Sequence, residues 1–136
     1  FSTKNRMAWL PLECRPNLFA YQTGILKNFD CPVIEINGVE DHVHILFLLS
    51  KNHALKTIVE ELKKGSSKWM KTAEGTQNSN FYWQGGYGAF SVSQSKLEVI
   101  RKYIQNQEQH HRKVSFQDEL SELFRLHEIE FDERYV

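Results

Sequence analysis

The sequence predicts a single α+β domain with a ferredoxin-like β-α-β-β-α-β order, an antiparallel sheet and additional C-terminal helices. Three observations predict this class. Apolar residues recur at helical spacing over about 16–29 and 54–71. Two short β-rich runs, 33–38 and 42–49, lie between these helices and are separated by a turn signal. An aromatic stretch punctuated by glycines, 81–92, suits a strand with a bulge.

This order requires one strand before the first helix. The chain opens with Phe1, Ser2 and Thr3 and has no initiator Met, so we expect these residues to end a truncated first strand and an N-terminal piece to be missing. The 136 residues suit one domain, 1–136. A chain of this length buries roughly two-thirds of the surface that it exposes when unfolded, so its core needs no disulfide or structural metal.

The strand at 42–49 is expected to be central. Side chains alternate along a strand, so one face carries Val43, Ile45, Phe47 and Leu49, and the other carries His42, His44, Leu46 and Leu48. Apolar residues on both faces predict that both are covered. Because the two helices cover one face, the histidine face requires a later helix or a partner chain.

Two further helices are predicted after the aromatic stretch. The third extends from about Lys96 to His111, with Ser93 or Ser95 as its N-cap. A last amphipathic helix, about 116–127, precedes an acidic tail over 128–133.

Composition limits the classes of function. The chain has 17 Lys and Arg against 17 Asp and Glu, which excludes a uniformly basic surface but allows a local basic stripe. Cys14 and Cys31 lack the spacing of a zinc or redox motif, so we expect reduced thiols. No apolar run approaches the ~20 residues of a membrane span, and no signal peptide opens the chain. We expect a cytoplasmic protein with no membrane partner.

Two histidines and a helix motif are the candidates for chemistry. His42 and His44 leave the same face of a strand about 6.6 Å apart, a spacing that suits two ligands of one metal ion. Tyr103 and Gln107 lie one turn apart on the third helix. The Gln amide oxygen is a candidate third ligand, and the phenol is a candidate nucleophile. Each feature alone is more often an ordinary structural residue than a catalytic or metal-binding one.

Together these four residues would support cleavage of a phosphodiester by tyrosine attack. A free tyrosine phenol has a pKa of about 10 and is a poor nucleophile at neutral pH. A divalent cation, Mg²⁺ or Mn²⁺, would polarise the phosphate and orient the scissile bond. The set contains no carboxylate, which predicts weak binding of Mg²⁺ and better occupancy with Mn²⁺.

Basic and aromatic residues are candidates for nucleic-acid contacts. A lysine stripe on the second helix could follow a phosphate backbone, although a solvated helix face explains it equally well. The candidates are Lys63, Lys64, Lys68 and Lys71 in this stripe and Arg101 and Arg112 beside the tyrosine helix. Phe81, Tyr82, Trp83 and Tyr87 could stack on unpaired bases or pack in the core.

Several motifs carry a family resemblance. The run DHVHIL at 41–46 resembles the His-hydrophobic-His motif of HUH endonucleases, and YIQNQ at 103–107 resembles their single-tyrosine motif. WQGGYGAFSVS at 83–93, QEQHH at 107–111 and FDERY at 131–135 are similar to stretches of the IS200-like transposases. The similarity covers nearly the whole chain.

The resemblance implies the HUH endonuclease fold and a homodimer that recognises hairpins at the ends of a mobile element. It implies metal-dependent cleavage and rejoining of single-stranded DNA through a 5′-phosphotyrosine. By position, Tyr103 is the nucleophile, and His42, His44 and Gln107 are the metal ligands. In such dimers the tyrosine helix can act with the partner's histidines.

Two alternatives are open at this point. One is a domesticated relative that binds DNA hairpins without mobilising an element. The other is a nuclease whose metal activates water, with Tyr103 only orienting the substrate. A covalent adduct between protein and DNA distinguishes the tyrosine mechanism from both.

Overall fold

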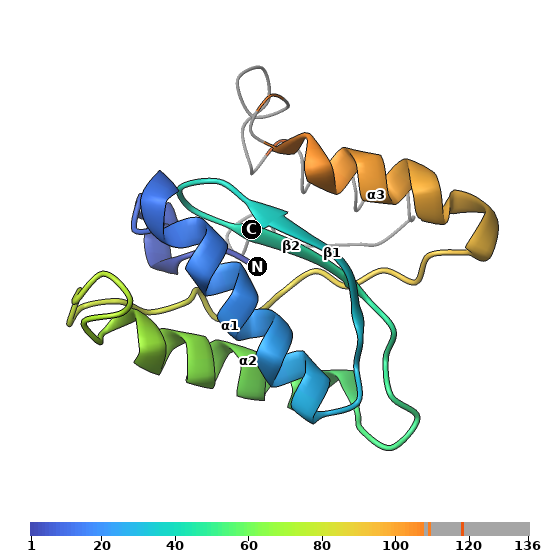
Figure 1. The fold of residues 1–136 in the computed structure, drawn as a ribbon, viewed down its shortest axis with the longest axis horizontal. Helices are drawn as coiled ribbons and strands as arrows, with labels where there is room; N and C mark the ends of the chain where they lie inside the picture. Colours follow the sequence, from blue (N-terminus) through green and yellow to red (C-terminus); the bar gives the residue numbers. More distant parts are fainter. Residues whose placement is uncertain (108, 110–117, 119–136) are drawn as a thin grey trace.

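The computed structural model describes residues 1–107, 109 and 118, and its fold is α+β, as the sequence predicts (Figure 1). Its helices and strands are α1 (Arg15–Asn28), β1 (Val33–Gly38), β2 (Val43–Phe47), α2 (Leu55–Met70) and α3 (Leu97–Gln105). Three short 3₁₀ turns join them: η1 (Lys4–Arg6), η2 (Leu12–Cys14) and η3 (Gln94–Lys96). No helix in the described part of the chain is long and apolar enough to cross a membrane.

The hairpin of β1 and β2 is the centre of the sheet. The strands pair antiparallel, with Gly38 opposite Val43 and Asn37 opposite His44. Gly38 is required at the end of β1, because a Cβ there would lie 2.3 Å from the backbone oxygen of His42. The hairpin can therefore close tightly and hold both histidines beside β1.

The first residues extend the sheet on the far side of β2. Ser2 forms an isolated antiparallel bridge with His42, and Thr3 forms one with Trp83. The Val43 amide donates to the Phe1 carbonyl over 2.9 Å. The segment 1–3 thus lies between β2 and Trp83, as a ferredoxin-like order requires, and β2 is central, as expected.

The predicted strand over 81–92 is wrong in its extent. Trp83 makes a single bridge, and 84–92 form no strand. Gly86 has a φ of 86°, in the left-handed region that interrupts an extended strand. The segment after Trp83 is therefore a connector that leads to α3.

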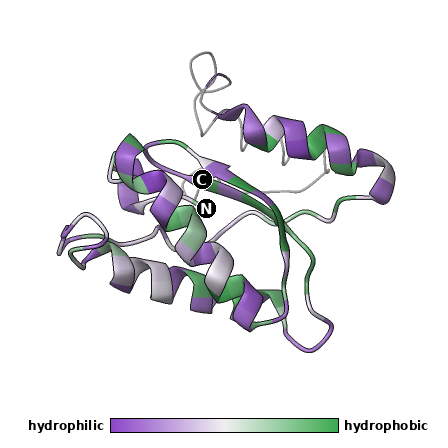
Figure 2. Ribbon diagram, in the orientation of Figure 1, coloured by the Kyte–Doolittle hydropathy of each residue, from purple (hydrophilic) through white to green (hydrophobic). Residues whose placement is uncertain are grey.

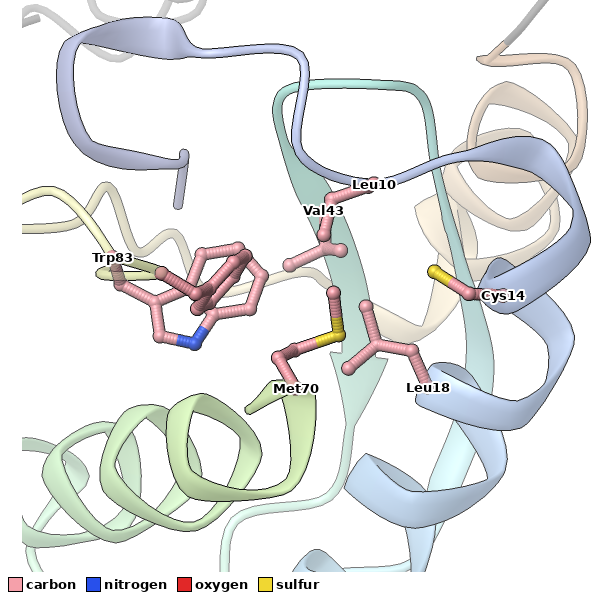
Figure 3. Packing of buried hydrophobic residues seen from close by; sticks show 7 residues of the cluster. Leu10, Cys14, Leu18, Val43, Met70 and Trp83 are labelled. Atoms are coloured by element: carbon pink, nitrogen blue, oxygen red, sulfur yellow. The ribbon is translucent and has the colours of Figure 1, made fainter. Parts of the chain in front are cut away.

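One face of the sheet packs on α1 and α2. Val43 on β2 contacts a buried cluster that includes Leu18 of α1, Met70 of α2 and Trp83 (Figure 3). Farther along β2, Ile45 and Phe47 pack against a second cluster that holds Leu26, Cys31, Ile58 and Leu62. Figure 2 shows hydrophobic residues concentrated along both strands, while the helices mix hydrophobic and hydrophilic residues. The alternation predicted for this face of β2 is thereby confirmed for Val43, Ile45 and Phe47.

The opposite face of the sheet lies under α3, so α2 and α3 are on opposite sides of the hairpin (Figure 1). Glu35 of β1 accepts hydrogen bonds from Arg101 over 3.2 Å and from Gln105 over 2.9 Å. A later helix of the same chain therefore covers the histidine face, one of the two predicted solutions.

Some predicted boundaries need correction. The strand ends at Phe47 rather than 49, and Leu48 and Leu49 are 57% and 48% exposed; the predicted cover over these two leucines is wrong. Ser93 precedes η3 and makes no helix-capping bond; its hydroxyl lies 3.2 Å from that of Ser95. The predicted helix over 116–127 and the acidic tail lie outside the described residues.

Candidate active site

The two histidines stand side by side on the face covered by α3. His42 directly precedes β2 and is fully buried, whereas His44 within β2 is partly buried. Their ring centroids are 5.1 Å apart and the rings are perpendicular. The predicted pairing of the two imidazoles is thus present in the structure.

Asp41 orients the buried histidine. Its Oδ1 lies 2.7 Å from Nδ1 of His42. A carboxylate accepts, so Nδ1 carries the hydrogen and, in the neutral ring, the lone pair is on Nε2. Sequence reasoning gave Asp41 no role, although its place directly before the histidine was the available signal.

Helix α3 brings the tyrosine and the glutamine to the histidines of the same chain. The rings of Tyr103 and His44 have centroids 5.9 Å apart. Gln107 is fully buried just beyond the end of α3. Its Nε2 donates to the Tyr103 carbonyl over 3.3 Å, and its Oε1 lies 3.4 Å from Nε2 of His42. All four predicted residues converge on one site.

The facing atoms of His42 and Gln107 fit a shared cation. With Nδ1 protonated, the lone pair on Nε2 of His42 faces the amide oxygen of Gln107, so two acceptors face each other. A cation between them, or a second proton on the imidazole, would satisfy both acceptors. Two atoms that each lie about 2.1 Å from one ion are about 3.0 to 3.4 Å apart. Among the described residues, no group of three or more His, Cys, Asp or Glu could hold a metal. A third ligand from this part of the chain would therefore be another residue type, and the Gln107 amide is the residue that the structure places next to His42.

A cavity of about 690 Å³ borders the same residues. His44 and Tyr103 line it together with apolar residues of β2 and α2 and with the connector from Gln84 to Val92. The tyrosine therefore lies beside open space rather than in a closed core. This space could admit a substrate next to the phenol.

Lys63 differs from the other lysines of the predicted stripe. Its Nζ donates to the carbonyl of Gln84 over 2.8 Å and to the carbonyl of Gly86. Burial lowers the pKa of Lys63. These two hydrogen bonds thus link the connector, which lines the cavity, to α2.

The remaining predicted DNA contacts occupy different surroundings. Lys64 and Lys68 are exposed on α2, and Lys71 follows its end, with Nζ 4.3 Å from the centre of the Tyr82 ring. Arg101 is bonded to Glu35. Arg112 lies outside the described residues.

The predicted aromatic candidates separate into two groups. Phe81 is fully buried and Trp83 is 8% exposed, so both belong to the core. Tyr82 and Tyr87 are 56% and 42% exposed. Only the two tyrosines are therefore accessible to an unpaired base.

Residues 1–107, which include the whole four-residue site, match the family model described as "Transposase IS200 like". The chain belongs to the IS200-like transposase family. The solved structure of "a putative transposase" from Deinococcus radiodurans R1 is similar to this transposase, with a TM-score of 0.61 and 24% identity. The match covers 79% of this chain and 85% of the other, and it supports the fold. No curated protein matches the chain. Membership of the family makes the protein a DNA-processing enzyme.

Proposed function

We propose that this transposase cleaves and rejoins single-stranded DNA at hairpin-marked element ends, with Tyr103 as the nucleophile. It acts in the cytoplasm on chromosomal or plasmid DNA, as a homodimer. His42, His44 and Gln107 hold a divalent metal, Mg²⁺ or Mn²⁺. One observation carries the proposal: α3 brings both the tyrosine and the glutamine to the histidines. The ring centroids of Tyr103 and His44 are 5.9 Å apart, and Oε1 of Gln107 lies 3.4 Å from Nε2 of His42.

The reaction is a transesterification. The phenolic oxygen of Tyr103 attacks phosphorus, the bond from phosphorus to the 3′ oxygen breaks, and the phenolic proton leaves as the 3′ oxygen takes one up. The product is a 5′-phosphotyrosine and a free 3′ hydroxyl. Attack by a 3′ hydroxyl on this phosphodiester reverses the chemistry, so rejoining needs no ATP.

Each neighbouring residue has a task in this proposal. A metal held by His42, His44 and Gln107 would polarise the phosphate. Asp41 fixes the His42 ring so that Nε2 points toward Gln107. Gln107 is bonded to the Tyr103 carbonyl, so the position of the ligand and that of the nucleophile are linked. Lys64, Lys68, Lys71 and Arg101 contribute positive charge for the DNA backbone, as does Arg112.

The decisive experiment is a denaturing gel that detects a covalent adduct with labelled single-stranded DNA from the ends of its element. Wild type and Tyr103→Phe are compared in Mn²⁺ and in EDTA, with Tyr21→Phe as the matched control. Tyr21 is an exposed tyrosine on α1 that stacks on Trp69. We expect an adduct that requires both metal and Tyr103.

Two other results would redirect the proposal. Hairpin binding by the wild type without any adduct would favour a binding-only relative. Cleavage without an adduct would favour a nuclease that activates water. If Tyr103→Phe loses DNA binding to the same extent as it loses adduct formation, the role of the phenol as the attacking group is contradicted.

A further inference from the structure

Tyr82 has an unusual position between two core residues. Phe81 and Trp83 pack edge-to-face with centroids 4.9 Å apart and are buried. Tyr82 between them is 56% exposed. Its backbone carbonyl accepts a hydrogen bond from the Lys4 amide over 2.9 Å. The backbone is thus fixed at both neighbours, while the ring is presented to solvent.

Two lysines approach this exposed ring. Nζ of Lys71, which follows α2, lies 4.3 Å from the ring centroid, and Nζ of Lys4 lies 6.0 Å from it. These distances are in the range of cation–π contacts, in which the ammonium is attracted to the ring. Neither ammonium group forms an ion pair within the described part of the chain. Both charges therefore remain available to an anionic partner.

We propose that Lys4, Tyr82 and Lys71 form a platform for one unpaired base of single-stranded DNA. The base stacks on the Tyr82 ring, and the two ammonium groups contact the flanking phosphates. The inference rests on the proposed function for its substrate and adds a binding site apart from Tyr103. An acidic protein partner would use the lysines but would gain little from the ring.

The sheet places this platform close to the histidines. Thr3 pairs with Trp83 and Ser2 pairs with His42. Adjacent strands are about 4.8 Å apart, so the backbones at Trp83 and His42 are separated by about 10 Å. A single strand bound on Tyr82 can therefore continue toward the phosphate that is cleaved. The platform positions DNA and takes no part in the chemistry.

The test measures binding without cleavage. Fluorescence anisotropy follows a labelled ten-residue oligothymidine and an abasic strand of the same length, in EDTA and at several salt concentrations. The variants are Tyr82→Ala, Tyr82→Phe and Lys71→Ala. Lys51→Ala is the charge-matched control, because Lys51 is exposed in the loop after β2.

We expect the wild type to prefer the strand that carries bases. Tyr82→Ala should weaken binding of oligothymidine by about 5- to 150-fold and remove this preference. Tyr82→Phe should retain it, because the ring face is preserved. Lys71→Ala should weaken both strands and reduce the salt dependence by about 0.7 in slope. Lys51→Ala should behave as wild type.

Three results would overturn the platform: equal wild-type affinity for both strands, unchanged affinity in Tyr82→Ala, or equal loss in Tyr82→Phe and Tyr82→Ala. The last result would assign Tyr82 a hydroxyl contact instead of a stacking role. Failure of the proposed function is separate, because it is measured by adduct formation at Tyr103. If the wild type forms an adduct but Tyr82→Ala binds DNA as tightly as the wild type, only the platform is ruled out. If the wild type forms no adduct but Tyr82→Ala loses affinity as expected, only the tyrosine mechanism is ruled out.

Discussion

The side-chain amide of Asn37 donates a hydrogen bond to the backbone carbonyl of Ile104 over 2.9 Å and a second to that of Gln105 over 3.1 Å. Carbonyls at the end of a helix lack partners within the helix, and Asn37 supplies them to α3. Asn37 is also the residue of β1 that pairs with His44 of β2. One side chain thus joins the end of the tyrosine helix to the strand position opposite the histidine.

Replacing Asn37 with Ala should loosen the docking of α3. Helix carbonyls lose their partner, and the Gly38 amide loses its 2.9 Å bond to the Asn37 side chain. We expect a loss of about 1 to 3 kcal/mol in the free energy of unfolding, measured by urea denaturation. Adduct formation at Tyr103 should slow more than DNA binding weakens. Asn52→Ala, at an exposed loop position, is the control, and equal stability of the two variants would contradict this role.

Asp41→Asn tests the orientation of His42. The amide can present its NH₂ group to Nδ1, which favours the other tautomer and places the hydrogen on Nε2, toward Gln107. We expect affinity for Mn²⁺ to fall about 10- to 100-fold, by calorimetric titration. Glu40→Gln is the matched control, because Glu40 is an adjacent, exposed acid. Unchanged Mn²⁺ affinity in Asp41→Asn would show that His42 is held by other contacts.

The convergence of the four site residues follows from local periodicity. Alternation places His42 and His44 on one face of a strand, and helical spacing places Tyr103 beside Gln107. The contact between Asp41 and His42 does not follow, because adjacent residues of a strand point to opposite faces. Asp41 lies in the turn before β2, where this rule fails and its carboxylate can reach the next ring.

Features that depend on the path of the connector were less predictable. The sequence at 81–92 has strand-like composition, yet pairing needs a partner at the right place, and only Trp83 has one, in Thr3. Lys63 lies on the charged side of an amphipathic helix, which predicts solvent or phosphate contact. Its bonds to the carbonyls of Gln84 and Gly86 depend on distant chain segments. Local sequence patterns cannot predict such long-range contacts.

Gln22 offers a test of stability in the core. It is fully buried on α1, and both side-chain polar atoms lack hydrogen-bond partners within the described part of the chain. Burying an amide without partners costs about 1 to 3 kcal/mol. Gln22→Met, which keeps the length and removes both polar atoms, should raise the melting temperature. Asn17→Met at an exposed position of α1 should give no such gain, and a lower melting temperature for Gln22→Met would show that the amide is satisfied.

Cys14 should be protected from alkylation in the folded protein. It is 8% exposed in the core cluster with Leu10 and Leu18, and burial raises the pKa of its thiol. The reactive species is the thiolate, so both access and ionisation are reduced. Iodoacetamide at pH 8, followed by peptide mass spectrometry, should modify Cys14 slowly in the native state and rapidly in urea. Equal rates in the two states would contradict the burial.

Because the pKa of Cys14 is raised in the folded state, the free energy of unfolding should fall as pH rises through the range of thiol ionisation. Below the ordinary thiol pKa, Cys14 is protonated in both states and its contribution to the free energy of unfolding is constant. As pH rises above that value, the unfolded chain loses the proton first, so the folded state becomes less stable until its own pKa is passed. We therefore expect urea denaturation between pH 8 and 10 to show a smaller loss of stability for Cys14→Ala than for Cys31→Ala, which retains Cys14. Parallel loss in the two variants would show that ionisation of Cys14 is not linked to folding.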